Sequence, residues 1–390
     1  MKQLFGAFLC LLFLVACSDS NDSNTPEPPS PPPSPPPSPP PVPPDFAAAD
    51  AWMQDFVDSE DAFPGGSYII VDKNLGVVHK KVFGNLTEDS LVLLASTSKV
   101  PTVTLLMALS DDDSIDFDID TPIANYLPWQ GVWDENITTK HLVSNRSGIP
   151  GLFQVLSNQA AAASHACQFF PIGTLYDCVE SLYTNPLPGF VSTPANTAFD
   201  YGGSQWQISG GVAESVGGAS WNQLWDQYIA QPCDIEITTY GNNLAIAAAW
   251  DGNPESLQGN DNPNMEGGMM ATLDDYAKLL SLHLSEGVCG DNRVLSAESL
   301  IEMRTATTLN EDGSGYYGMG WWFEPANETG TTTVFTDGGA WGSLSWIDAE
   351  RNYAGVVFFE EYTGTEANKA TSGARNQLIP IVAEAFDAVQ

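Results

Sequence analysis

The sequence is poor in basic residues. Its 390 residues include 13 Lys and Arg against 49 Asp and Glu, which gives a formal net charge of −36. A chain without a basic face cannot neutralise phosphates, so nucleic acid is excluded as a partner. Electrostatic docking on an anionic membrane is disfavoured for the same reason. Charged residues make up only 16% of the chain, so the acidity reflects missing Lys and Arg.

Histidine and cysteine are also scarce. Four histidines leave little room for a His-rich metal site, and no two of the six cysteines have C-x-x-C spacing. We therefore expect no metal and no cofactor. Four cysteines lie downstream of residue 17, and four cysteines allow three disulfide connectivities. The preferred pairing joins Cys167 to Cys178 and Cys233 to Cys289.

Long hydrophobic runs are absent except at the N-terminus, where Leu4 to Ala16 is too short to span a bilayer. Residues 1–16 are typical of a signal peptide. The stretch ends in Leu-Val-Ala before Cys17, which resembles the lipobox of bacterial lipoproteins and predicts lipidation at Cys17. The alternative is an ordinary secretory signal. We expect an exported protein, anchored by its lipid to a bacterial cell membrane and facing the periplasm or the cell surface.

Half of the 28 prolines lie just after this segment, in the run from Pro26 to Pro44. Proline fixes φ and lacks a backbone donor, so the run predicts an extended polyproline II rod. Residues 17–45 are therefore interpreted as a lipidated tether, and the folded domain as residues 46–390. Apolar residues at 43% of the chain are ample for a sizeable core.

Strand patterns are confined to the two ends of this domain. They cover residues 67–72, 77–83, 316–323, 331–336, 342–348 and 353–359. Helical spacing predicts helices at 47–59, 96–109, 205–216, 221–229, 273–284, 297–303 and 370–388. The early strands have only the late strands to pair with. The prediction is an α+β fold: an antiparallel sheet from both chain ends, flanked by terminal helices, with a mostly helical lobe inserted at about 115–305.

A Ser-x-x-Lys pair opens the helix predicted at 96–109. Ser96 and Lys99 are three residues apart and so lie on one helix face. Apolar flanks predict a buried lysine, and a lysine whose pKa is lowered by burial can act as the base for an attacking serine. The alternative is a solvated lysine on a helix face.

Two further segments have the residues for such chemistry. Tyr201 stands in a loop that enters the helix at 205–216, where it can share a proton with a lysine; otherwise it is a packed aromatic residue. Asp337, Gly338 and Gly339 end a predicted strand before Ala340. Glycines there let the backbone approach a substrate and leave an N–H free as an oxyanion donor, or else they form a bulge.

These three motifs, in this order, resemble those of the serine β-lactamase and penicillin-binding superfamily, especially its class C β-lactamase-like branch of esterases and D-amino-acid peptidases. The likeness runs from about residue 50 to residue 390. Supporting segments are residues 115–128, 137–148, 266–277 and 318–321.

The resemblance implies a role for each matching residue. Ser96 would be the acylated nucleophile, with Lys99 and Tyr201 as the base system. The backbone N–H groups of Ser96 and Ala340 would form the oxyanion hole.

Two positions depart from the pattern. Gly203 stands where the family has an asparagine, and Asp337 stands where it has a cation that binds the β-lactam carboxylate. Of the residues expected to contact substrate (Gly203, Asp337, Gly338 and Gly339), the aspartate would repel anions. The substrate is therefore predicted to be a small neutral ester. The tryptophans Trp133, Trp206 and Trp341 are candidates for an apolar acyl pocket.

Two alternatives stay open. One is a D-amino-acid peptidase or peptidoglycan-stem hydrolase, with β-lactamase activity less favoured; the other is a non-catalytic binding lipoprotein. Other hydrolase templates fit poorly, because neither G-x-S-x-G nor H-E-x-x-H occurs. His141 and His283 stand in apolar helix patterns and are interpreted as structural. The expected partners are then a small ester or peptide substrate, and the membrane only through the lipid.

Overall fold

The computed structural model describes residues 42–59, 63–309, 316–324, 333–362 and 364–389. The fold below is that of the unit Pro43–Gln390. The predicted signal peptide, the predicted lipidation at Cys17 and nearly all of the predicted tether lie outside the described residues. No helix within the described ranges is long and apolar enough to cross a bilayer.

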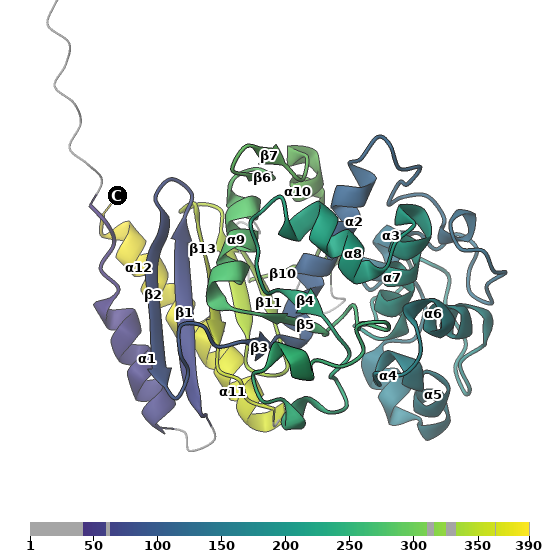
Figure 1. The fold of residues 1–390 in the computed structure, drawn as a ribbon, viewed down its shortest axis with the longest axis horizontal. Coiled ribbons are helices and arrows are strands. Elements are labelled where there is room, and N and C mark those ends of the chain that lie inside the picture. The colour runs from purple at the N-terminus through teal and green to yellow at the C-terminus, as the bar shows by residue number, and fades with distance from the viewer. Residues whose placement is uncertain (1–41, 60–62, 310–315, 325–332, 363, 390) are drawn as a thin grey trace, which may run out of the picture. The chain divides into compact units, whose positions relative to one another are not determined.

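An eight-stranded antiparallel sheet joins the two ends of the domain, as predicted (Figure 1). Its order is β2-β1-β13-β12-β11-β10-β9-β8. The early strand β1 pairs with the late strand β13, with Ile69 opposite Val356. The strands are β1 (Gly65–Asp72), β2 (Gly76–Gly84), β8 (Thr308–Leu309), β9 (Tyr316–Tyr317), β10 (Trp322–Phe323), β11 (Val334–Gly338), β12 (Leu344–Asp348) and β13 (Tyr353–Phe358).

Both faces of the sheet are covered, so its central strands are buried throughout. Alternate residues of β1 serve two cores: Ile69 and Val71 face one, Tyr68 and Ile70 the other. The second core is closed by the terminal helices α1 (Ala47–Ser59), α11 (Gly364–Gly373) and α12 (Ile379–Asp387), the last two joined through a π-helical turn, η7 (Ala374–Leu378). The first core is closed by α2 (Lys99–Ser110) and α9 (Leu273–Leu284).

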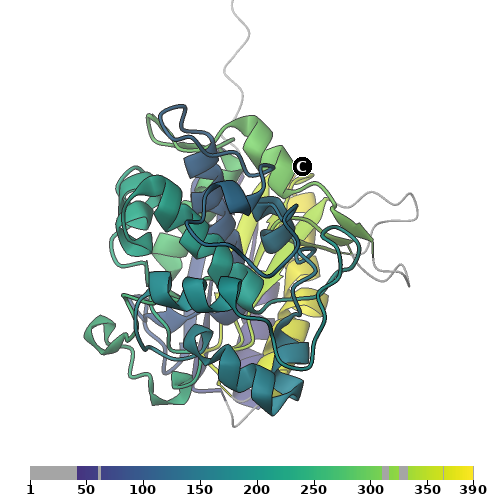
Figure 2. The same cartoon turned by 90° about the vertical axis from the view of Figure 1, so that its right-hand side faces the viewer.

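The inserted middle of the chain is mostly helical, as predicted, and Figure 2 views the molecule from the side of this lobe. Its α-helices are α3 (Thr139–Val143), α4 (Leu152–Ser157), α5 (Gln159–Ser164), α6 (Leu175–Thr184), α7 (Ser204–Gly217), α8 (Trp221–Trp225), α9 and α10 (Ala297–Met303). Short helical turns are η2 (Ile123–Asn125), η3 (Ala166–Gln168), η4 (Asp226–Ala230), η5 (Ala247–Ala249) and η6 (Pro254–Ser256). The predicted disulfides, Cys167–Cys178 and Cys233–Cys289, are both present.

Two features differ from the sequence prediction. The strand expected at 316–323 is two strands, β9 and β10, because residues 318–321 form a turn closed by the bond from Gly318 N to Trp321 O. A three-stranded sheet, β3 (Val92–Leu93), β5 (Met269–Ala271) and β4 (Thr239–Tyr240), and a hairpin of β6 (Val288–Cys289) and β7 (Asn292–Arg293) were not foreseen. Strands of two or three residues are too short to show a period-2 pattern.

Candidate active site

Ser96 lies at the entrance to the buried helix α2. A short 3₁₀ turn, η1 (Ala95–Ser98), precedes α2, and Ala95 has a left-handed φ of 47°. From Leu91 to Val100 every residue is buried except Ser96, which is half-buried. The turn therefore exposes one serine hydroxyl at the start of an otherwise inaccessible helix. Strained backbone of this kind is often found at functional sites.

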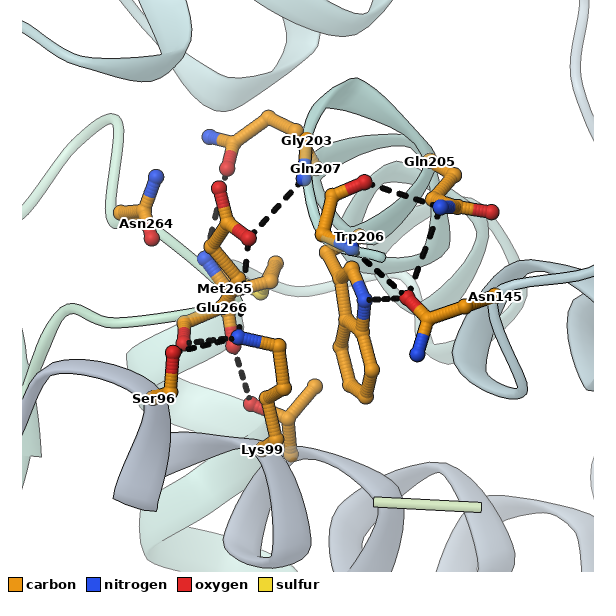
Figure 3. Close-up of polar contacts among 12 residues, drawn as sticks. Ser96, Lys99, Asn145, Gly203, Gln205, Trp206, Gln207, Asn264, Met265 and Glu266 are labelled. Atoms are coloured by element: carbon orange, nitrogen blue, oxygen red, sulfur yellow. Dashed lines mark hydrogen bonds and ion pairs between the residues drawn. The ribbon is translucent and has the colours of Figure 1, made fainter. Parts of the chain in front are cut away.

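Lys99 is fully buried directly behind Ser96. Its Nζ donates hydrogen bonds to Ser96 Oγ at 2.9 Å and to the backbone oxygen of Glu266 at 3.0 Å (Figure 3). Glu266 Oε2 is 3.5 Å from the same nitrogen. This burial excludes the alternative of a solvated lysine on a helix face.

The direction of the pKa shift of Lys99 differs from the one that the sequence suggested. Burial by itself would lower the pKa of Lys99. The electrostatic interactions with Tyr201, Glu266 and Asp337 are larger in sum, so the pKa of Lys99 is raised. The prediction of a lowered pKa was wrong because it considered desolvation alone. Two acidic side chains share the interior with this lysine, so the ammonium form is favoured.

Tyr201 reaches the site from the loop that precedes α7. Lys99 Nζ lies 4.7 Å from the centre of the Tyr201 ring and 5.2 Å from that of Trp206, at distances typical of cation–π contacts. Tyr201 also packs on Trp322, with ring centres 5.4 Å apart. Tyr201 is thus brought to the Ser96–Lys99 pair, from which it is about a hundred residues away in sequence.

Ala340 approaches Ser96 through the turn between β11 and β12. Gly339 packs so closely on the residue before η1 that a Cβ there would stand 2.1 Å from the backbone oxygen of Leu94. Ala340 is exposed, and within the described part of the chain its N–H has no acceptor. The turn therefore supplies a free donor beside the cavity that contains Ser96, as an oxyanion hole requires.

A cavity of about 430 Å³ opens on Ser96. It is lined by Ala95, Ser96, Leu152, Leu156, Ala162, Phe169, Phe170, Leu244, Ala245, Glu266, Gly267, Ala340 and Trp341. We call Leu152, Leu156, Phe169, Phe170, Leu244 and Trp341 the apolar wall, and Ser96, Lys99, Tyr201 and Glu266 the polar corner. The lining contains no lysine, arginine or histidine.

Of the three tryptophans considered, only Trp341 lines this cavity. Trp206 is buried beside Lys99, where its Nε1 donates to Asn145 Oδ1 at 2.8 Å. Trp133 packs in a small separate core and donates to the backbone oxygen of Leu182 at 2.9 Å. Their aromatic rings belong to the packing of the lobe.

The residues expected to contact substrate are placed differently. Gly203, Asp337, Gly338 and Gly339 are absent from the cavity lining. Asp337 is fully buried, and its Oδ2 accepts from Val100 N at 3.2 Å in the first turn of α2. Burial raises the pKa of Asp337 well above its usual range. The expected direct repulsion of a substrate carboxylate by Asp337 is therefore not supported, because its side chain faces α2.

Two residues of the site were missed by sequence reasoning. Glu266 was given no role, although it is a charged residue at the start of an apolar stretch that continues to residue 273. Asn145 holds the loop before α7, because its Oδ1 accepts from Gly202 N at 2.9 Å and from Trp206 Nε1 at 2.8 Å. No local pattern marks Asn145, since its partners are more than fifty residues away.

The two histidines are structural, as predicted. His141 closes a capping box at the start of α3, where Thr138 N donates to its Nδ1 at 3.2 Å. His283 is buried with Nε2 3.0 Å from Thr104 Oγ1, and burial lowers its pKa to about 3. Within the described ranges, no group of three or more His, Cys, Asp or Glu could hold a metal ion.

A half-buried serine backed by a buried lysine, beside a free backbone donor and a cavity, defines a site of the serine hydrolase class. The Beta-lactamase family model matches residues 49–378. The chain therefore belongs to the Beta-lactamase family of serine hydrolases.

Individual relatives are distant. Penicillin-binding protein 4 of Amycolatopsis lactamdurans is 25% identical over 301 residues, which cover 69% of this chain and 73% of that protein. The crystal structure of a putative beta-lactamase from Bacteroides dorei has a TM-score of 0.69 at 22% identity, covering 88% of this chain and 99% of that one. EstCE1, described as a hydrolase with promiscuous acyltransferase activity, has a TM-score of 0.66 at 16% identity, covering 88% and 98%. These structural likenesses establish the fold.

Proposed function

We propose that this protein is a serine esterase that hydrolyses small neutral esters with apolar acyl groups through an acyl-enzyme on Ser96. The observation that carries the proposal is the cavity of about 430 Å³, which joins Ser96 and Ala340 to the apolar wall. Burial of each methylene in such a wall contributes about 0.8 kcal/mol. The lining has no cation, so an anionic acyl group would find no counter-ion there.

The proposed reaction has two halves. Ser96 Oγ attacks the carbonyl carbon, its proton passes to the Lys99–Tyr201 pair, and the alcohol leaves with that proton. Water then attacks the acyl-enzyme, gives up a proton to the same pair, and releases the carboxylic acid and Ser96. The N–H groups of Ser96 and Ala340 would stabilise the oxyanion in both halves.

The raised pKa of Lys99 supports a division of roles within the pair. A lysine that stays protonated donates to Ser96 Oγ and cannot accept its proton. The acceptor in this proposal is therefore the oxygen of Tyr201, whose ring centre lies 4.7 Å from Lys99 Nζ.

Activity-based labelling followed by a substrate panel tests the proposal. We expect a fluorophosphonate to label Ser96, and p-nitrophenyl acetate and butyrate to be hydrolysed. The Ser96→Ala variant should lose both properties while its melting temperature stays unchanged, with a loss in kcat/KM of at least about 10³-fold. A folded wild-type sample that neither reacts with the probe nor turns over either ester would support the non-catalytic binding lipoprotein instead.

A second candidate is a peptidase on D-amino-acid peptides or peptidoglycan stems, for which the likeness to penicillin-binding protein 4 is the specific observation. Hydrolysis of D-Ala-D-Ala peptides in preference to simple esters would favour it. Rapid turnover of nitrocefin would favour a β-lactamase and contradict the assignment of neutral substrates.

We also propose that the protein is exported and anchored through a lipid on Cys17. The lipobox-like sequence before Cys17 supports this, as do two disulfides, which form in oxidising compartments. A Cys17→Ala variant should move from the membrane fraction to the soluble fraction, and intact mass should show the lipid on the wild type only. A membrane-bound Cys17→Ala variant would contradict the anchor.

A further inference from the structure

Glu266 is placed against Lys99 through two different atoms. Its backbone oxygen accepts from Nζ at 3.0 Å, and its carboxylate oxygen Oε2 lies 3.5 Å from the same nitrogen (Figure 3). The side chain of Glu266 is 4% exposed, and Glu266 lines the Ser96 cavity at the polar corner. One residue therefore contacts Lys99 twice, at the end where Lys99 meets the nucleophile.

The surroundings of Nζ match an ammonium group. Three oxygens face it, from Ser96 Oγ, the Glu266 backbone and the Glu266 carboxylate, and an ammonium has three protons to donate. A neutral amine has only two N–H groups, so its lone pair would face the third oxygen and repel it. A charge buried without a counter-ion is strongly destabilising, so Lys99 and Glu266 need one another.

The loop before α7 is shaped around this carboxylate. Gly203 N donates to Glu266 Oε2 at 2.9 Å. Gly203 has φ 85° and ψ −161°, a conformation essentially restricted to glycine. At Gly202, a Cβ would stand 2.6 Å from Glu266 Oε2. Because Gly202 and Gly203 have no side chains, they leave room for the Glu266 carboxylate. The N–H of Gly203 is the backbone donor to that carboxylate.

We propose that Glu266 is a positioning residue of the hydrolase: its carboxylate keeps Lys99 charged and directs Nζ toward Ser96 Oγ. This inference rests on the proposed catalytic role of Ser96, but not on the identity of the substrate. Glu266 acts through Lys99 and needs no contact with the reacting atoms.

Protonation of Glu266 should therefore reduce activity on the acid side. Burial raises its pKa, while Lys99 and the N–H of Gly203 oppose that rise. Among the described residues, the charged and titratable groups that face the pair are Tyr201, Tyr317 and Asp337. Because the pKa of Glu266 lies above its ordinary value, the acid limb of the rate should appear at a higher pH than an exposed glutamate would produce.

The experiment compares Glu266→Gln and Glu266→Ala with wild type. The glutamine keeps the shape and an acceptor for Gly203 N but removes the charge. The control is Glu214→Gln, because Glu214 also accepts a backbone N–H, from Trp221 at 2.8 Å, and also has a pKa raised by burial, yet lies outside the cavity lining. Two rates are measured against pH: phosphonylation of Ser96 by a neutral fluorophosphonate, and hydrolysis of p-nitrophenyl acetate.

We expect Glu266→Gln to lower both rates about 100-fold, as a misplaced catalytic group does, with KM little changed and the acid limb lost. Added formate should restore part of the activity of Glu266→Ala, because it fits the space that the carboxylate vacates, but should leave Glu266→Gln unaffected. Glu214→Gln should keep the wild-type rates and profile.

Wild-type rates and an unchanged acid limb in Glu266→Gln would overturn the inference. If both Glu266 variants fail to fold, wild-type phosphonylation that stays constant with pH down to the ordinary pKa of a glutamate would overturn it instead. Labelling that depends on Glu266 without ester turnover would support the role of Glu266 and refute the esterase. An unlabelled Ser96 in folded wild-type protein would overturn both proposals.

Discussion

The two sides of the Ser96 cavity are built in different ways. The polar corner is set in the core: Lys99 is fully buried and Glu266 nearly so, and each is bound to several partners. The apolar wall comes from short helices and loops, and two of its residues, Leu156 and Phe170, are 53% and 42% exposed. Placing the chemistry on rigid elements and selectivity on peripheral ones is a common division. It implies that mutations can separate the two properties.

The wall has restraints of its own. The Cys167–Cys178 disulfide encloses the segment that contains Phe169 and Phe170. Buried asparagine side chains hold the same segment: Asn242 Nδ2 donates to the backbone oxygen of Phe170 at 3.1 Å, and Asn262 Nδ2 to that of Cys167 at 2.8 Å. A disulfide and hydrogen bonds from buried asparagines therefore hold this part of the wall.

The largest effect is expected from Lys99→Met, which acts on the polar corner alone. Loss of the ammonium should reduce kcat/KM at least about 10³-fold. It also leaves the Glu266 carboxylate buried without a counter-ion, so the free energy of unfolding in urea should fall by about 3–5 kcal/mol. Adding Glu266→Gln should recover most of the stability and none of the activity. Retained activity in Lys99→Met would remove Lys99 from the mechanism.

The next effect distinguishes the two disulfides. Replacing Cys167 and Cys178 by serine should cost about 3 kcal/mol of stability, and the same change at Cys233 and Cys289 about 4 kcal/mol, because the second bridge closes a longer loop. Although Leu244 lies in the long loop closed by the second pair, the first pair holds Phe169 and Phe170 within a loop of 11 residues. We therefore expect it alone to weaken the preference for butyrate over acetate, measured as the ratio of kcat/KM values.

The opposite result would contradict the division between wall and corner. A changed chain-length preference in the Cys233–Cys289 variant, or none in the Cys167–Cys178 variant, would show that the segment around Phe169 does not select the acyl group.

A cation placed in the wall gives a smaller effect of defined sign. Leu156→Lys should lower kcat/KM for p-nitrophenyl butyrate several-fold, since burial of each methylene of the acyl chain is worth about fourfold. The same variant should raise kcat/KM for a monosuccinate ester. The control is Ile301→Lys on α10, because Ile301 is 67% exposed and lies outside the cavity lining. An equal response in both variants would mean that overall charge, and not the wall, determines the preference.

The smallest effect concerns Asp337, beneath the corner. Burial raises its pKa, so protonation stabilises the folded state, and the carboxylate lowers stability at any pH above the unfolded pKa. Asp337→Asn keeps an acceptor for Val100 N and removes the titration. Its gain in free energy of unfolding should be absent below about pH 4 and grow as the pH rises, to about 1–3 kcal/mol. A gain that falls with rising pH would show a favourable ion pair at Asp337.

Much of the fold follows from local pattern. Helix α1 (Ala47–Ser59), helix α9 (Leu273–Leu284) and helix α10 (Ala297–Met303) have the boundaries predicted from apolar spacing. The union of early and late strands in one sheet was also predicted, because unpaired strand edges must find partners. The last predicted helix is interrupted by the π-helical turn η7, which spacing alone does not reveal.

Only part of the candidate site could be predicted from the sequence. Ser96 and Lys99 are three residues apart, so helix geometry alone brings them together, and the motif order extended this to Tyr201 and Ala340. Glu266 was missed, and the side chain of Asp337 was assigned to the wrong face, because both depend on contacts between segments more than 150 residues apart.

The sequence by itself left the disulfide connectivity open, but it determined the family, the sheet joining the chain ends and the apolar helix that carries Lys99, because spacing and apolar pattern act over short stretches of chain. Only the tertiary structure decided the charge of that lysine, the burial of Asp337 against α2 and the apolar lining of the cavity. Each of these depends on which distant side chains share a small buried volume, and electrostatic energy in that volume depends on distance in space and not along the chain.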